Sequence, residues 1–246
     1  MRVYIIEHKK VDLPKLSDIY AELQVGAAIN GKIDSVDYYD NDGENISDKN
    51  ISYNELTGLY WIWKNSNEDI IGLCHYRRFF VDAKAKIMNV IFGEKGGYIS
   101  EKKIRKKLQH SDMIVHNKTY YSSSNKEQFE KTQKYPNDLD IVEKVIDEYY
   151  PDYSDAYKKV VYGKNSHLLN MMIARKQIVD EYCEWLFGVL FKVEDTLQKN
   201  GETEFQRRIG MLGERLLDVW IEKNNIKVCE MFSINTERRD CSIIAG

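Results

Sequence analysis

The sequence predicts an α/β protein built on a mixed, mostly parallel central sheet flanked by helices. The short apolar run 69–74 (D-I-I-G-L-C) is typical of a strand that is covered on both faces. A helix followed by a strand over 100–116 supports an alternating order of elements. A chain of 246 residues can form one large α/β domain or two small ones, and we expect a single domain over 1–246.

The composition indicates a globular protein. It is 43% hydrophobic with a formal net charge of -3, so we expect no nucleic-acid partner. No run approaches the roughly eighteen apolar residues of a membrane span, and the opening is too short for a signal peptide. Any membrane association is therefore expected to be peripheral. The cysteines lack C-x-x-C spacing and are expected to be reduced thiols: Cys74, Cys183, Cys229 and Cys241.

Basic and aromatic residues follow directly after the predicted strand 69–74. They are His75, Tyr76, Arg77 and Arg78. Ligands of α/β sheets bind outside the carboxyl ends of strands, and guanidinium groups match phosphate oxygens bidentately. The group therefore indicates a phosphate or diphosphate site, although a strand that ends on solvated charge explains it equally well.

A buried helix is expected over 53–65, just before that strand. Ser52 and Glu55 form a capping-box pattern at its start. The helix is apolar almost all round, and Trp61 and Trp63 lie on different faces. Core aromatics are therefore favoured over a platform that stacks a sugar or a base.

Two features near the start of the chain suit a nucleotide. A first strand over 2–7 ends at His8, which is how nucleotide-binding α/β domains begin, although no glycine fingerprint follows. Gly26 and Ala27 belong to the small apolar run 25–28, which permits close approach of the backbone to a ligand. A plain turn explains that run at least as well.

The acidic turn 40–45 has two interpretations. Asp40 and Asp42 form a D-x-D pair, and carboxylates at that spacing hold Mg²⁺ or Mn²⁺ against a diphosphate. The alternative is a turn rich in Asp and Asn whose side chains bond their own backbone.

The segment 81–135 is interpreted as a lid or acceptor insertion. Its mixture of lysines and apolar residues near 84–92 also suits an anionic lipid surface. A poorly packed insertion is the simpler alternative, and the charge run 102–107 is interpreted as a solvated helix face.

Two polar residues lie in apolar surroundings near the end of the chain. Asn170 falls inside an expected strand over 167–174, where an amide needs a partner or a ligand. Glu214 lies beside Arg215 on an expected helix over 212–221. The two are either a base with its orienting group or an intrahelical ion pair.

Seven motifs spread over nearly the whole chain occur together: V-G-A-A (25–28), G-E-N-I-S-D-K-N (43–50), E-L-T-G-L-Y-W-I-W-K-N (55–65), I-G-L-C-H-Y-R-R-F-F (71–80), N-M-M-I (170–173), Y-C-E-W-L-F (182–187) and G-E-R-L-L-D-V-W (213–220). With them the sequence resembles a family of bacterial capsular and exopolysaccharide glycosyltransferases, often described only as a domain of unknown function. The resemblance implies a GT-A-like domain that binds a nucleotide sugar. Such folds carry a D-x-D at the end of a later strand, where this chain has its basic group 75–78.

The resemblance implies transfer of a hexose from a UDP-sugar to a hydroxyl of a lipid-linked oligosaccharide. It also implies a cytoplasmic protein that works at the inner face of the cell membrane, with peripheral membrane contact as an option. No covalently bound cofactor is expected, and Mn²⁺ or Mg²⁺ is an option. The alternatives are a non-catalytic carbohydrate-binding or assembly protein, and a phosphohydrolase of a nucleotide or lipid diphosphate. The expected catalytic residues are His75, Arg77, Arg78 and Glu214. The expected donor-binding residues are His8, Gly26, Ala27, Asn45, Tyr76 and Asn170, with Asp40 and Asp42 as metal ligands.

Overall fold

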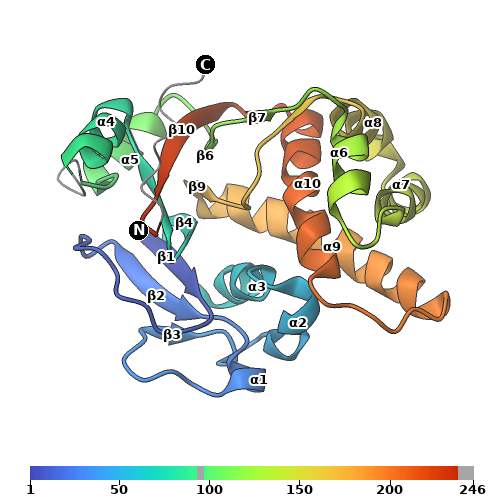
Figure 1. Cartoon of the computed structure of the whole chain (residues 1–246), viewed down its shortest axis with the longest axis horizontal. Helices are drawn as coiled ribbons and strands as arrows, with labels where there is room; N and C mark the ends of the chain where they lie inside the picture. Colours follow the sequence, from blue (N-terminus) through green and yellow to red (C-terminus); the bar gives the residue numbers. More distant parts are fainter. Residues whose placement is uncertain (93–96, 238–246) are drawn as a thin grey trace.

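The chain folds around an eight-stranded sheet with helices on both faces (Figure 1). The structure is a computed structural model that describes residues 1–92 and 97–237. The strand order is β3-β2-β1-β4-β5-β10-β6-β9, and β4 also pairs with β9, so that part of the sheet closes on itself. The strands are β1 Arg2–Glu7, β2 Tyr20–Gln24, β3 Tyr38–Tyr39, β4 Ile70–His75, β5 Arg78–Val81, β6 Met113–His116, β9 Met172–Arg175 and β10 Val228–Asn235, and a separate pair is β7 Thr119–Tyr120 with β8 Asn165–Ser166.

The sheet is mixed, as expected, but it is not mostly parallel. Strands β3, β2, β1 and β4 run parallel to one another, and β6 runs parallel to β10. Strands β5 and β9 run antiparallel to their neighbours. Over both sheets of the described residues, antiparallel pairings number five and parallel pairings four. One cause is local: β4 turns directly into β5, and a connection that short joins only antiparallel strands.

Helices cover the sheet on two sides. Helices α9 and α10 pack against each other, and α7 and α8 pack on them. Helices α4 and α5 lie at the opposite end of the long axis from α7 and α8 (Figure 1). The helices are α1 Ala27–Asn30, α2 Asn50–Tyr53, α3 Leu56–Asn65, α4 Ala83–Phe92, α5 Glu101–Lys107, α6 Asn125–Thr132, α7 Asp138–Tyr149, α8 Ser154–Val161, α9 Lys176–Lys199 and α10 Arg208–Lys223.

Strand β1 shows how one sequence pattern fills both cores. Tyr4 and Ile6 belong to the core under α3, α9 and α10, whereas Val3 and Ile5 belong to the core under α5. Successive side chains of a strand point to opposite faces, so a strand between two helical layers is apolar throughout. The same holds for β4, which confirms the interpretation of 69–74 as a doubly covered strand.

The expected helix over 53–65 is interrupted. Helix α2 ends before Asn54, whose φ of 50° breaks the helical path, and α3 begins at Leu56. Ser52 lies inside α2, and its buried hydroxyl has no hydrogen-bond partner in the described part of the chain. The predicted capping box is therefore wrong, and the Glu55 side chain does not cap a helix that starts at Ser52. Trp61 is buried in the core, as expected.

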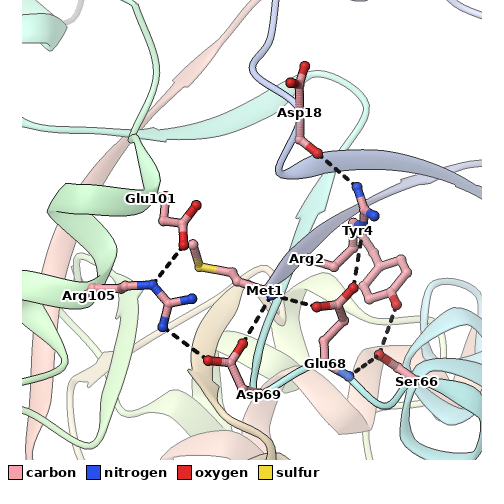
Figure 2. A network of polar contacts seen from close by, with 9 residues as sticks. All are labelled: Met1, Arg2, Tyr4, Asp18, Ser66, Glu68, Asp69, Glu101 and Arg105. Atoms are coloured by element: carbon pink, nitrogen blue, oxygen red, sulfur yellow. Dashed lines mark hydrogen bonds and ion pairs between the residues drawn. The ribbon is translucent and has the colours of Figure 1, made fainter.

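The start of β4 is joined to α5 and to the beginning of the chain (Figure 2). The Met1 amino group contacts Glu68 and lies 3.0 Å from Asp69 Oδ1. Arg105 Nη1 donates to Asp69 Oδ2 at 3.0 Å, and Arg105 Nε donates to Glu101 at 2.7 Å. Hydrogen bonds from these two cations lower the pKa of Asp69 to about 2. Helix α5 is thus fixed to the start of β4.

Part of the segment 81–135 is sheet rather than insertion. Strand β6 lies within it, and Met113, Ile114 and Val115 are fully buried. No helix of the described residues is long and apolar enough to cross a membrane. Within the described ranges, free thiols are present at Cys74, Cys183 and Cys229. The fourth expected thiol, Cys241, lies outside the described residues.

Candidate active site

A cavity of about 370 Å³ opens at the carboxyl ends of β1 and β4. These strands are parallel neighbours, with Ile6 opposite His75, so both end at the same edge of the sheet. The backbone N–H of Tyr76 donates to the Ile6 carbonyl at 3.1 Å and holds the turn after β4 against β1. Six of the expected site residues line the cavity: His8, His75, Tyr76, Arg77, Arg78 and Glu214.

His75 is the last residue of β4 and is held by the loop before β9. Its Nε2 lies 2.6 Å from the Leu169 carbonyl oxygen, which accepts only, so Nε2 carries the proton. Burial lowers the pKa of His75, with further lowering by Arg78 and Arg77. A lowered pKa favours the neutral imidazole, whose hydrogen bond to the Leu169 carbonyl ties the end of β4 to the loop before β9. The catalytic role expected of His75 stays a prediction.

Arg77 and Arg78 both bring positive charge to the cavity. The Arg77 guanidinium lies 5.4 Å from the Tyr76 ring centre and donates to Glu237 at 3.0 Å. The backbone of Arg78 pairs with His75 in β4 and with β10 on its other side, which fixes the start of its side chain. Two guanidinium groups from adjacent residues match the spread charge of a diphosphate.

An aromatic pair forms one wall beside the arginines. The rings of His8 and Tyr76 meet edge to face with 5.5 Å between their centres. Burial, Lys9 and Arg77 lower the pKa of His8. A neutral imidazole and a phenol ring form an apolar face with polar tips, which suits a base or a sugar ring.

Two carboxyl groups enter the same cavity, Glu55 and Glu214. Burial, with repulsion from Glu55, raises the pKa of Glu214 to about 7. Burial also raises the pKa of Glu55, while the Asn170 amide, whose Nδ2 donates to Glu55 Oε1 at 2.8 Å, acts in the other direction. Glu214 was among the residues expected from the sequence and Glu55 was not, because the spacing of Glu55 from Ser52 matched a helix start.

The loop before β9 carries two residues in the left-handed region. Leu169 has φ 84° and Asn170 φ 50°, and such a conformation is costly for a leucine. The expected strand over 167–174 therefore begins only at Met172. The loop aims the Leu169 carbonyl at His75 and the Asn170 amide at Glu55. Asn170 thus acts on a cavity residue and does not line the cavity itself.

The Asp40 side chain joins separate segments of the chain because hydrogen-bond donors surround it. Its carboxylate accepts from the backbone N–H of Gly26 (2.8 Å) and Ala27 (3.0 Å), and from the hydroxyls of Ser47 (2.5 Å) and Thr57 (2.6 Å). The side chain is fully buried. The four bonds occupy both oxygens, so Asp40 has no position left for a metal ion.

The remaining expected residues of this region also have structural contacts. Asp42 is exposed and pairs with Lys32 at 2.7 Å, so it does not converge with the enclosed Asp40, and the D-x-D pair does not fit a metal. The Asn45 side chain donates to the Gly43 carbonyl at 2.8 Å and accepts from the Ser47 N–H, as in the alternative interpretation of an Asx-rich turn. These residues lie outside the cavity lining.

Gly26 shapes the cavity through its backbone. Its φ is 70°, and a Cβ atom there would lie 2.6 Å from Oδ1 of Asn50, which lines the cavity. The lining also includes Asn54 and Arg207, which were not among the expected site residues. Arg207 has φ 61° and donates its backbone N–H to the Ile51 carbonyl at 2.7 Å. Arg207 reaches the cavity because the start of α10 packs on α2, a contact between distant segments that the sequence does not reveal.

The fold is similar to that of a known glycosyltransferase. The apo structure of the bifunctional glycosyltransferase WbbM superposes with a TM-score of 0.80 at 28% sequence identity. The match covers 96% of this chain and 45% of that one, so this chain spans less than half of WbbM. No curated protein gives a significant match. The family model described as "Domain of unknown function (DUF4422)" matches residues 2–225, and the chain belongs to this family.

Proposed function

We propose that the protein is a hexosyltransferase that uses a UDP-linked donor and a lipid-linked oligosaccharide acceptor in the synthesis of a bacterial capsule or exopolysaccharide. The observation that carries the proposal is one cavity that combines Glu214, with its pKa of about 7, and the two arginines of the β4–β5 turn. The likeness to WbbM supports the reaction class, because that protein is a glycosyltransferase.

The arginines stabilise the leaving group. As the bond between the anomeric carbon and the diphosphate oxygen breaks, negative charge develops on UDP. Arg77 and Arg78 are positioned to receive it through charge-assisted hydrogen bonds. The Glu237 carboxylate occupies Arg77 in the structure, and the diphosphate takes its place when the donor binds.

Glu214 accepts the proton of the attacking hydroxyl. A general base works best when its pKa is close to the working pH, and a pKa of about 7 meets that condition. The acceptor oxygen forms its bond to the anomeric carbon while its proton passes to Glu214. Glu55 raises the basicity of Glu214 by repulsion and is itself held by Asn170.

The acceptor enters through a neighbouring cavity of about 450 Å³. The two cavities share Arg207, and Met211 lines the second one. Met211 and Glu214 are three residues apart on α10 and so share one helix face, and Arg207 directly precedes the helix. A glycan that lies along this face ends at the base.

The second cavity has a rigid floor. Arg208 makes two hydrogen bonds of 2.7 Å to the Asp138 carboxylate, and both side chains are buried. The Arg208 guanidinium lies 4.0 Å from the centre of the Tyr135 ring. An aromatic ring fixed in this way, with amide groups of Gln133 and Gln206 nearby, suits a sugar ring.

Calorimetry with UDP, in the presence of Mn²⁺ and of EDTA, tests the donor site. We expect binding in EDTA, and Arg77→Ala and Arg78→Ala each weaken it by about tenfold or more, because each loses a charge-assisted hydrogen bond. Arg105→Ala is the matched control, since this arginine is similarly exposed and ion-paired but lies outside the cavity.

Several outcomes contradict the proposal. Unchanged UDP affinity in both cavity variants removes the role of the arginines. Saccharide binding without any nucleotide affinity favours a carbohydrate-binding protein, and release of product with water alone favours a phosphohydrolase. Tyr135→Ala separates the two cavities: transfer to saccharide acceptors is expected to weaken while UDP affinity stays at the wild-type value.

A further inference from the structure

Helix α4 packs on the sheet through one face and exposes two isoleucines on another. Its buried face includes Ala85 and Asn89, whose Nδ2 donates to the Gly97 carbonyl at 3.1 Å. Ile87 and Ile91 are instead 51% and 63% exposed. An isolated exposed isoleucine is ordinary, but two at i, i+4 spacing form a continuous apolar strip on one helix face.

A lysine lies on the same exposed face. Lys84 precedes Ile87 by three residues and Ile91 by seven, so the three side chains share one face, which we call the α4 outer face. Lys84 is exposed and has no ion pair in the described residues. Isoleucines flanked by lysine are typical of helices that lie in a membrane interface.

Positive charge is concentrated around this helix. The segment 82–110 has eight Lys and Arg residues and three Asp and Glu residues, a net charge of +5 in a chain whose net charge is -3. Lys102 and Lys106 are exposed and have no ion pair in ranges 1–92 and 97–237. Between α5 and β10 a further cavity of about 500 Å³ is lined by Lys103, Lys106 and Lys107.

The two helices are fixed to each other and to the sheet. Asp82 accepts from the Ala85 N–H at 2.7 Å at the start of α4, and it also pairs with Lys103 of α5. Ile104 is buried under α5, and Arg105 reaches Asp69 at the start of β4 (Figure 2). The lysines of α5 therefore keep their place beside α4, at one end of the molecule (Figure 1).

From these contacts we infer that α4 docks the protein on an anionic lipid bilayer. The α4 outer face inserts Ile87 and Ile91 among the lipid chains, and the lysines of α4 and α5 bind the anionic headgroups. Charge complementarity selects the lipid surface, because positive charge beside an apolar strip matches an anionic interface. This inference does not depend on the proposed transferase activity.

The test is cosedimentation of the whole chain with vesicles of phosphatidylcholine, with or without an equal part of phosphatidylglycerol. We expect wild type to bind only the anionic vesicles and to be released by high salt. The double variant Ile87→Ser with Ile91→Ser is expected to lose about tenfold or more in partitioning. Lys102→Ala with Lys106→Ala is expected to lose about tenfold at low salt and little at high salt.

The control replaces two other exposed isoleucines, Ile29→Ser with Ile51→Ser, on helices α1 and α2. It should bind vesicles like wild type. The inference is overturned if wild type does not sediment with anionic vesicles, or if the two double isoleucine variants bind equally. It is also overturned if wild type forms dimers that the α4 variant abolishes, since a second copy then covers this face. No nucleotide is present, so failure here leaves the transferase proposal unaffected.

Discussion

Asp40 is a fully buried carboxyl group and Glu214 a partly buried one, and their surroundings differ. Asp40 accepts four hydrogen bonds, two from the backbone N–H groups of Gly26 and Ala27 and two from hydroxyls. Glu214 lies in a cavity beside a second carboxyl group, Glu55, and its pKa is raised to about 7. Donors stabilise the charge of the first group, whereas burial and repulsion destabilise the charge of the second.

The difference separates structural from chemical acids in this fold. A carboxylate saturated with donors has no free lone pair for a substrate and holds segments together. A carboxyl group that titrates near neutrality exchanges a proton at little cost. Asp40 therefore contributes to the stability of the fold, and Glu214 is the group that we propose for the reaction.

The largest expected effect is on turnover. Glu214→Gln keeps the shape of the side chain but removes its basicity, so kcat is expected to fall by about a hundredfold to ten-thousandfold. UDP affinity should stay within about threefold of wild type. Glu222→Gln, on the same helix but paired with Lys159 at the surface, is the control and should keep full turnover. Full turnover in Glu214→Gln would contradict the assignment of the base.

The next effect is on stability. Asp40→Ala leaves the N–H groups of Gly26 and Ala27 without their acceptor, and we expect the free energy of unfolding to fall by about 3 kcal/mol. Asp42→Ala, which breaks only the exposed pair with Lys32, should cost less than about 1 kcal/mol. Urea titration of both variants measures the difference. Equal costs, or loss of metal-dependent UDP binding at unchanged stability in Asp40→Ala, would argue for a metal role.

The order of the main buried elements was predictable from local patterns. Strands β1 and β4 are apolar throughout because both faces are covered, and α10 repeats its apolar residues at helical spacing. The directions of β5 and β9 were not predictable. They depend on pairing between β4 and segments far along the chain, which no local pattern encodes.

Cavity residues were predictable from the sequence where polar side chains come directly after a recognisable strand. The group 75–78 lies at the cavity because it comes directly after β4. Glu55 was missed because the helix break at Asn54 depends on its surroundings, while the local spacing matched a capping box. Asp40 was taken for a metal ligand because its four donors come from three separate segments, and only the fold brings them together.

The smallest expected effect is that of Glu214 on the pH dependence of stability, and it tests the difference between Glu214 and Asp40. The pKa of Glu214 rises from its usual 4.5 to about 7 in the folded protein, so the folded state holds more protons than the unfolded state between those values. The carboxyl group therefore leaves the free energy of unfolding unchanged below about pH 4.5 and lowers it progressively as the pH rises to 7. Above pH 7 we expect the cost to reach about 2 to 3 kcal/mol.

Replacing the group isolates its contribution. Burial also raises the pKa of Glu7 to about 7, so wild type and Glu214→Gln share that part of the pH dependence. The variant should match wild type in free energy of unfolding at pH 4 and exceed it by about 2 kcal/mol at pH 8. Urea titrations at the two pH values measure this difference. Parallel pH curves for the two proteins would mean that Glu214 titrates normally, and the base would then have to be Glu55, the only other carboxyl group among the described residues that line the cavity.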